Sequence, residues 1–247
     1  MRASALEFRL RMAINAIIII LGFWAPWIEA WHIGRRISLL EWLALELGRA
    51  GIASFSLATR ALLILAMLIA AKAALFRVWG AAYLGPSTVN SMNMVAGKVV
   101  ADGPYRYLRN PLYIGLWCMI IALAFLMPVS GAVFAVILSA IFAVRLTLGE
   151  EAFLTMKSGE FYVAYMRAVP RFIPRLRGAP ARGNARPYWL RASLTELTPI
   201  GAFVAIIIFW STYDPELTGR VILVFFGASL VVRAFLPSVP VKSESAQ

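Results

Sequence analysis

Residues 103–115 read GPYRYLRNPLYIG, and they run without a break into an apolar segment that ends at Met127. The loop is polar, aromatic and basic, whereas the segment after it is apolar enough to enter a membrane. A helix that starts at this junction has its first turn beside the tyrosines and arginines of the loop. The stretch therefore predicts a reaction site at the mouth of a transmembrane helix.

A second apolar segment leads to the acidic pair Glu150-Glu151, and a basic tract follows that closes with VPRFIP at residues 169–174. Only Pro128 and its neighbours separate the two apolar segments, so we expect them to form a tight antiparallel hairpin. We also expect the second helix to end at the acidic pair. The hairpin then brings two charged clusters together at one end.

The composition determines the class of protein. Hydrophobic residues make up 61% of the 247 residues and charged residues 15%, and the mean hydropathy is +0.78. Such a chain cannot fold around one soluble core. We predict an all-α integral membrane protein with about six transmembrane helices, in the runs Met12–Trp31, Ala58–Phe76, Leu112–Met127, Val129–Val144, Leu197–Thr212 and Val221–Leu236. The second run carries Arg60 and Lys72, so five crossings are the alternative.

Lysine and arginine set the orientation, because loops rich in them stay in the cytosol. Six crossings put both termini, the connector before Arg109 and the tract Arg145–Arg191 on the basic side. We therefore predict that the termini and the reaction site are cytosolic. The net charge of +12 then follows from topology and from attraction to anionic membrane lipids, and no nucleic-acid partner is needed to explain it.

Cysteine and histidine exclude several kinds of site. Cys118 and His32 are each the one residue of their type in the chain, so neither a disulfide nor a zinc cluster is available, and we predict no metal site. The segment Tyr188–Glu196 is expected to be a short interfacial helix, and the polar tail Ser238–Gln247 to be disordered.

The hairpin mouth combines features that suit a charged guest. Asn110 is expected to cap the first helix by accepting a backbone N–H, with Pro111 at the first helical position. The free N–H groups and the positive dipole end there attract a carboxylate. At the other helix, Glu150 and Glu151 add negative charge to an end that is already negative, which is unfavourable unless a cation compensates.

One patch thus holds an anion site, a cation site and aromatic faces. The residues are Lys98, Arg106 and Arg109 for the anion, Glu150 and Glu151 for the cation, and Tyr105, Tyr107 and Tyr113 for the faces. S-adenosylmethionine matches all three, through its carboxylate, its ammonium and sulfonium groups, and its adenine. Taken singly, each element has a simpler interpretation: an ordinary helix start, a solvated acidic pair and a solvated basic face.

Four motifs, in this order and spacing, resemble the carboxyl-terminal half of the isoprenylcysteine carboxyl methyltransferase and phospholipid methyltransferase superfamily. They are the block 97–115, the pair Glu150-Glu151, GEFYVAY at 159–165 and the closing VPRFIP. The resemblance covers about residues 90–176. It implies a catalytic core there, between an N-terminal membrane part, 1–89, and a C-terminal part, 177–247, with the last two helices.

The resemblance also implies a cytosolic pocket for S-adenosylmethionine, built from the hairpin and the loop after it. Carried over by position, the donor-binding residues are Lys98, Val99, Val100, Tyr105, Asn110, Pro111, Leu112, Tyr113, Glu150 and Glu151. Tyr113 and Arg145 are the candidate catalytic residues, with Arg145 as a contact to the acceptor. Asn110 stands where the family usually has histidine, and asparagine can hydrogen-bond but cannot be protonated.

The expected reaction is a direct displacement that moves the methyl group to a lipophilic acceptor, either an isoprenylcysteine-like carboxylate or a lipid headgroup. Positioning and exclusion of water would supply the catalysis, and no residue demands a general-base role. The alternatives are a noncatalytic membrane scaffold of the same fold, motivated by Asn110, and a small-thiol S-methyltransferase. A transporter is disfavoured because charged residues are nearly absent from the span centres. The oligomeric state is left open.

Overall fold

The computed structural model describes residues 2–84, 101–175 and 185–235. Within these ranges the chain is helical, and its β-pairing is a single isolated bridge between Ser38 and Pro128. The predicted all-α class is confirmed. The elements are α1 (Ala5–Arg9), α2 (Arg11–Trp24), α3 (Pro26–Ala30), α4 (Leu39–Arg49), α5 (Phe55–Leu84), the 3₁₀ turn η1 (Gly103–Arg106), α7 (Pro111–Ala124), α8 (Val129–Ala168), α9 (Trp189–Thr195), α10 (Leu197–Thr212) and α11 (Pro215–Phe235).

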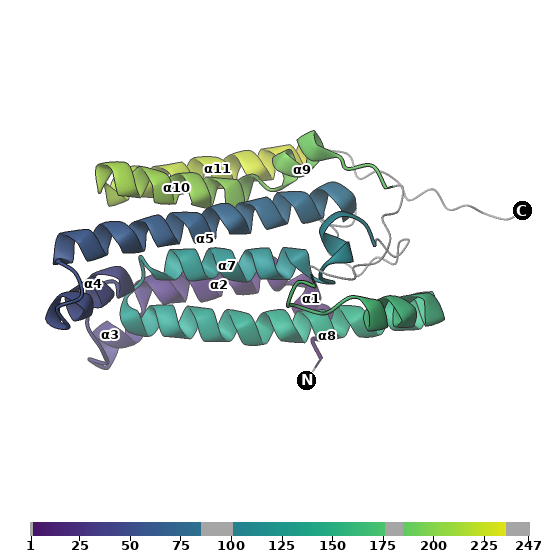
Figure 1. Cartoon of the computed structure of the whole chain (residues 1–247), viewed down its shortest axis with the longest axis horizontal. Coiled ribbons are helices and arrows are strands. Elements are labelled where there is room, and N and C mark those ends of the chain that lie inside the picture. The colour runs from purple at the N-terminus through teal and green to yellow at the C-terminus, as the bar shows by residue number, and fades with distance from the viewer. Residues whose placement is uncertain (1, 85–100, 176–184, 236–247) are drawn as a thin grey trace, which may run out of the picture.

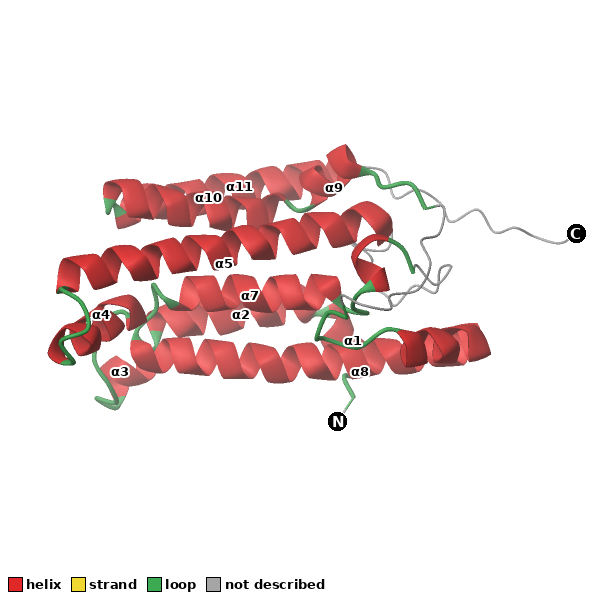
Figure 2. Ribbon diagram, viewed as in Figure 1, coloured by secondary structure: helices red, strands yellow, loops and turns green. Residues whose placement is uncertain are grey.

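The long helices α2, α5, α7, α8, α10 and α11 lie side by side along the length of the molecule (Figure 1). α3 and α4 gather at one end of this bundle, which we call the α4 end. α1, η1 and α9 lie at the other, the η1 end (Figure 2). Successive long helices run in opposite directions, so the start of α7 and the acidic pair of α8 lie at the same end.

The described part of each of the six predicted apolar runs is mostly helical, and the first run is divided between α2 and α3. Four helical segments in the described part of the chain are long and apolar enough to cross a membrane, namely Arg11–Ala30, Phe55–Leu84, Val129–Ala168 and Pro215–Val232. The pair α9 and α10, bent by 70°, makes a fifth if it is counted as one span. The third run forms α7, which has 14 residues and is shorter than the roughly 20 that a full crossing takes. By length and composition, the described helices therefore account for five membrane crossings, the lower of the two predicted numbers, when α9 and α10 are counted as one span.

Two predicted helix ends were wrong. α8 does not end at Glu150-Glu151 but continues to Ala168, so the expected unfavourable end charge does not arise. The reason is that residues 145–158 contain no proline and mostly good helix formers; the helical backbone is first interrupted at Gly159, whose φ is +54°. The second apolar run, expected to end at Phe76, continues in α5 to Leu84 and so includes Arg77.

Small residues let α7 lie between its neighbours. A side chain at Gly115 of α7 would come within 3.1 Å of the Ala73 carbonyl oxygen of α5. A side chain at Gly131 of α8 would collide with the Gly22 carbonyl of α2. Close backbone approach of this kind is typical of helix packing in membranes. It fixes α7 against α5 and α8 against α2, and the candidate site lies where α5, α7 and α8 meet at the η1 end.

Candidate active site

The start of α7 is organised by Asn110, though not as a helix cap. Asn110 is buried and forms no capping hydrogen bond. Its amide nitrogen donates instead to Glu151 Oε1 at 3.4 Å and to the Arg171 carbonyl oxygen at 3.3 Å. The capping prediction was wrong because a carboxylate from the neighbouring helix competes for this side chain. Pro111 does occupy the first turn of the helix, as predicted.

Glu151 holds the two charged loops together. Arg171 donates to both of its oxygens, at 3.1 Å and 2.7 Å, and Arg109 approaches it at 3.4 Å. Glu151 is buried, and its charge raises the pKa of Arg171. We call Glu151, Arg109, Arg171 and Asn110 the Glu151 clamp. Since Arg109 belongs to the clamp, the prediction that it helps to form an open anion site was wrong.

Backbone contacts reinforce the clamp. The Arg109 amide donates to the Pro170 carbonyl at 2.9 Å, and the Arg175 amide donates to the Tyr107 carbonyl at 2.9 Å. The Tyr165 hydroxyl donates to the carbonyl of Tyr105 at 2.8 Å. The VPRFIP segment is therefore bound to the loop before α7, and together they form one rigid edge of the site.

Glu150 has a different environment. Its Oε2 accepts a hydrogen bond of 3.0 Å from the Tyr113 hydroxyl of α7. It takes part in none of the ion pairs of the described residues, and Arg11 acts on it at longer range. Tyr113 and Glu150 thus lie in direct contact at the hairpin mouth, as the sequence-based pocket requires. A half-buried carboxylate held by one phenol retains acceptor capacity for a further donor or cation.

Tyr105 adds an unsatisfied polar group beside this carboxylate. Its ring is buried, and within the described ranges its hydroxyl has no hydrogen-bond partner. Burial raises the pKa of Tyr105 well above its ordinary value, with Glu150 the next largest cause, so the phenol stays protonated. Buried polar groups normally have partners. The combination of a protonated hydroxyl and a carboxylate without an ion pair fits a polar, positively charged guest.

An ion pair that the sequence analysis missed supports the site from the other side. Arg77 of α5 donates to Glu196 at 2.6 Å and 2.9 Å, and also to the Leu112 carbonyl at 3.2 Å. Glu196, at the bend between α9 and α10, is buried. The position of Arg77 at the end of an apolar run could have indicated that it is paired, because ionisable residues in membrane-spanning segments are rare and usually have a partner. The pair connects the last two helices to the residue before Tyr113.

Arg145, the candidate contact to the acceptor, pairs with the N-terminal segment. It binds Glu7 of α1 at 2.8 Å, and its carbonyl accepts from the Ala3 amide at 3.0 Å. Hydrogen bonds from the Ser4 backbone and from Arg145 lower the pKa of Glu7. Phe8 of the same segment packs in a cluster that Tyr113 also touches. Arg145 therefore lies near the site, and its catalytic role stays a prediction.

The other predicted residues either lie outside the described part of the chain or contact side chains of the protein. Lys98, Val99 and Val100 lie outside the described residues. Tyr107 contacts Trp79, with ring centroids 6.2 Å apart, and the Arg106 guanidinium lies 5.6 Å from the Tyr107 ring centre. This aromatic face therefore has partners within the protein.

An apolar pocket of about 190 Å³ opens beside Tyr113. It lies between α7 and α8 and is closed on one side by Phe172 of the VPRFIP segment. Its other lining residues are Ile114, Trp117, Ala140, Ala143 and Val144. Such a pocket takes hydrocarbon and has no group that would hold a charged ligand.

Comparison with known proteins identifies the segment that carries this geometry. A family profile described as phospholipid methyltransferase matches residues 60–160, which include both Tyr113 and Glu150. Residues 60–160 are thus similar to the phospholipid methyltransferase family. The resemblance inferred from the sequence motifs is confirmed. The family segment begins in α5 and ends in α8, so it contains the three helices that surround the site.

Two curated relatives match this chain over 78 and 79 residues. Protein-S-isoprenylcysteine O-methyltransferase of Schizosaccharomyces pombe is 36% identical over 78 residues, or 31% of this chain and 33% of the relative. Protein-S-isoprenylcysteine O-methyltransferase B of Arabidopsis thaliana is 34% identical over 79 residues, or 31% of this chain and 40% of the relative. The matched part thus spans between a third and two fifths of these relatives. No solved structure matches the chain.

Proposed function

We propose that this protein transfers a methyl group from S-adenosylmethionine to a lipophilic acceptor at the cytosolic face of a membrane. The observation that carries the proposal is the 3.0 Å contact between Tyr113 and Glu150 inside the family segment. Both relatives are named as methyltransferases, which supports the reaction class. The apolar helices support a membrane location.

The donor would be held by Glu150, Tyr105 and Tyr113. When bound, S-adenosylmethionine supplies a methyl group on a positively charged sulfonium. Glu150 would accept from its ammonium group, and the Tyr105 hydroxyl, which has no partner in the described residues, would gain one. The Tyr113 phenol would keep the Glu150 carboxylate oriented. Glu150 and the Tyr105 hydroxyl both have hydrogen-bonding capacity that the described residues leave unfilled.

Catalysis would come from positioning. The Glu151 clamp and the Arg77–Glu196 pair hold the two ends of the loop and the first turn of α7, so Tyr105 and Tyr113 are fixed before a ligand binds. A site fixed in this way removes much of the entropic cost of bringing two reactants together. Surroundings poor in water favour a reaction in which charge is neutralised. A carboxylate acceptor is already ionised and needs no protein base.

The acceptor would enter from the membrane. The apolar pocket beside Tyr113 would take part of its hydrocarbon, and Arg145 would attract a carboxylate in place of Glu7. An isoprenylcysteine-like carboxylate fits both features, and a phospholipid headgroup is the other acceptor that the family description suggests. The many arginines at the η1 end support a cytosolic site, since basic loops stay in the cytosol.

Transfer of labelled methyl groups tests the proposal. Membranes that contain the protein are incubated with S-adenosylmethionine labelled in the methyl group, and the lipid extract is separated and identified by mass. We expect label in an apolar product, and we expect the Glu150→Gln variant to lose most of it. Equal labelling by membranes without the protein would overturn the proposal, and a water-soluble thioether product would indicate a small-thiol acceptor instead.

A second variant tests the acceptor pocket separately. Ala143→Leu adds three carbons to the wall of the apolar pocket. We expect the KM for the acceptor to rise about tenfold or more, because one or two displaced methylenes are worth about 1–2 kcal/mol. Donor affinity should not change. An unchanged KM for the acceptor would remove this pocket from the proposal.

A further inference from the structure

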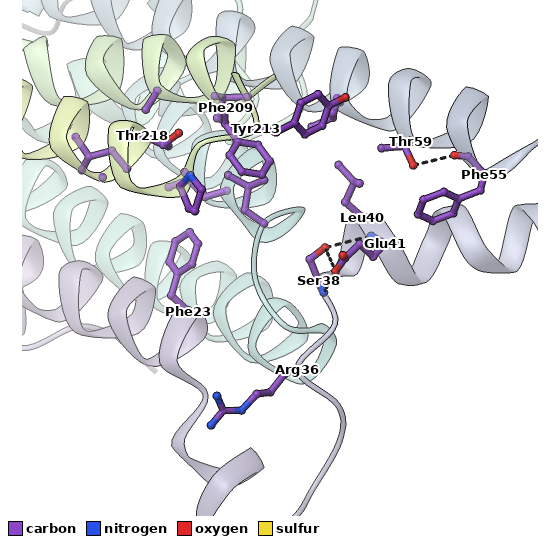
Figure 3. A pocket seen from close by; sticks show the side chains of 18 residues that line it. Phe23, Arg36, Ser38, Leu40, Glu41, Phe55, Thr59, Phe209, Tyr213 and Thr218 are labelled. Carbon is purple, nitrogen blue, oxygen red and sulfur yellow. Dashed lines mark hydrogen bonds between the residues drawn. The ribbon is translucent and has the colours of Figure 1, made fainter. Parts of the chain in front are cut away.

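A larger cavity, of about 960 Å³, lies at the α4 end, away from Tyr113 and Glu150. It is bounded by α4, α5, α10 and α11, with Phe23 of α2 on one side (Figure 3). Its deep wall is formed by Leu63, Leu123 and Ile206, which are all buried. This volume is at the upper end of what small-molecule sites enclose.

Four polar side chains that line the cavity are hydrogen-bonded within the protein, namely Ser38, Glu41, Thr59 and Thr218. The Ser38 hydroxyl and the Glu41 carboxylate bind each other in a capping box (Figure 3). The Thr59 hydroxyl donates to the Phe55 carbonyl, and the Thr218 hydroxyl donates to the Asp214 carbonyl. The deep wall has nothing to offer a polar ligand, and water would find few partners there.

The cavity also separates helix α11 from helix α4. α11 packs mainly on α10 and α9, and the cavity lies between α11 and α4. If it were empty, the lining side chains would lose van der Waals contacts on one side. In a membrane, the abundant molecule that can fill an apolar space of this kind is a lipid chain.

The charges at the rim indicate which lipid. Arg36 lines the cavity and pairs with Glu29, and Glu41 lies close by. Charges of both signs match a zwitterionic headgroup, with its phosphate near Arg36 and its ammonium near Glu41. We propose that the cavity binds one acyl chain of a zwitterionic membrane phospholipid, whose headgroup lies at this rim. The lipid would fill the space between α11 and α4 and join them, independently of the methyl transfer proposed above.

Gly219 provides a direct test. It lines the cavity on α11, and a Cβ there would meet no atom within 4 Å, so a leucine fits and occupies the space. Gly227, on the same helix, has equally open surroundings but does not line the cavity. Gly227→Leu is therefore a matched control for helix propensity and added apolar surface.

The experiment measures phospholipid retained by the full chain. Wild type, Gly219→Leu and Gly227→Leu are purified in mild detergent, dioleoyl phosphatidylethanolamine is added, and bound lipid is counted by native mass spectrometry. We expect one tightly held phospholipid on wild type and on Gly227→Leu, and at least tenfold weaker retention on Gly219→Leu. Equal retention by both variants, or a dimer that excludes lipid, would overturn the proposal.

A measurement on wild type covers the case in which Gly219→Leu does not fold. A phosphatidylethanolamine with a photoreactive group at the end of its acyl chain is placed in liposomes with the protein and irradiated. We expect crosslinks on peptides around Leu63 of α5 and Ile222 of α11, which line the cavity. Crosslinks confined to the outer faces of the bundle would contradict the proposal.

Discussion

Glu150 and Glu151 are neighbours in sequence, yet they lie in two different regions of the molecule. Successive residues of a helix point about 100° apart, so Glu150 faces α7 and Glu151 faces the loop at residues 169–175. Glu151 is bound by two arginines and an asparagine, whereas Glu150 is bound by one phenol. Two neighbouring carboxylates can therefore have different roles. Glu151 holds the loops together, and Glu150 is the carboxylate that we propose binds the ligand.

Removal of the Glu151 carboxylate should have the largest effect. Glu151→Ala leaves the buried Arg109 and the partly exposed Arg171 facing each other without a counter-charge. We expect a loss of about 3 kcal/mol in the free energy of unfolding, measured by denaturation in detergent. If stability falls equally in Glu150→Ala, the division between the two carboxylates is wrong.

Neutralising Glu150 should weaken donor binding and leave stability nearly unchanged. A charge-assisted hydrogen bond contributes about 1.5–3 kcal/mol, so Glu150→Gln should raise the Kd for S-adenosylmethionine by roughly 10- to 100-fold. Equilibrium binding of labelled donor to the purified protein measures this. Glu160→Gln is the matched control, because Glu160 is exposed on the same helix, and its Kd should equal that of wild type.

Loss of the Tyr113 hydroxyl should have a smaller effect in the same direction. Tyr113→Phe keeps the ring but removes the donor to Glu150. A single hydrogen bond to a charged group, replaced in part by water, predicts a rise in donor Kd of about 3- to 10-fold. The effect should vanish when it is measured in the Glu150→Gln background. Additive losses in the double variant would mean that the phenol acts without Glu150.

The smallest effect should come from the Glu7–Arg145 contact, which is half-buried and independent of the acidic pair. The pKa of Glu7 lies below its ordinary value of 4.5 when the protein is folded, so its contribution to stability is present above that pH. The contribution is lost as pH falls through the lowered pKa. Wild type and Glu7→Gln should therefore differ slightly in melting temperature at pH 6 and converge as the pH falls below the lowered pKa of Glu7. Glu41→Gln, which removes the charge from a similar capping box that has no arginine partner, should show a smaller difference at pH 6.

The sequence predicted the features that depend on hydropathy and order along the chain. The described parts of the six apolar runs are mostly helical. The hairpin brings Tyr113 to Glu150, because antiparallel helices joined by a short turn must share their ends. The helix end at Glu150-Glu151 could not be predicted from the end of the apolar run, since polar residues continue a helix as readily as apolar ones when no breaker intervenes.

The sequence also could not predict which partners individual side chains have in the fold. Asn110 is a good capping residue by type, but Glu151 lies within reach in the fold and takes its amide instead. Arg77 and Glu196 are 119 positions apart, and only the packing of α5 against α9 and α10 brings them together. Long-range pairs such as this depend on helix rotation and register, which hydropathy does not determine.

The structure of the protein with bound S-adenosylmethionine is the most direct test of the central claim, that Glu150 and Tyr113 face one ligand whereas Glu151 holds the loops. We expect the donor to lie within hydrogen-bonding distance of Glu150 and Tyr105, and we expect the Glu151 clamp to be unchanged. A donor bound to Glu151, or bound elsewhere while Glu150 touches Tyr113 alone, would contradict it.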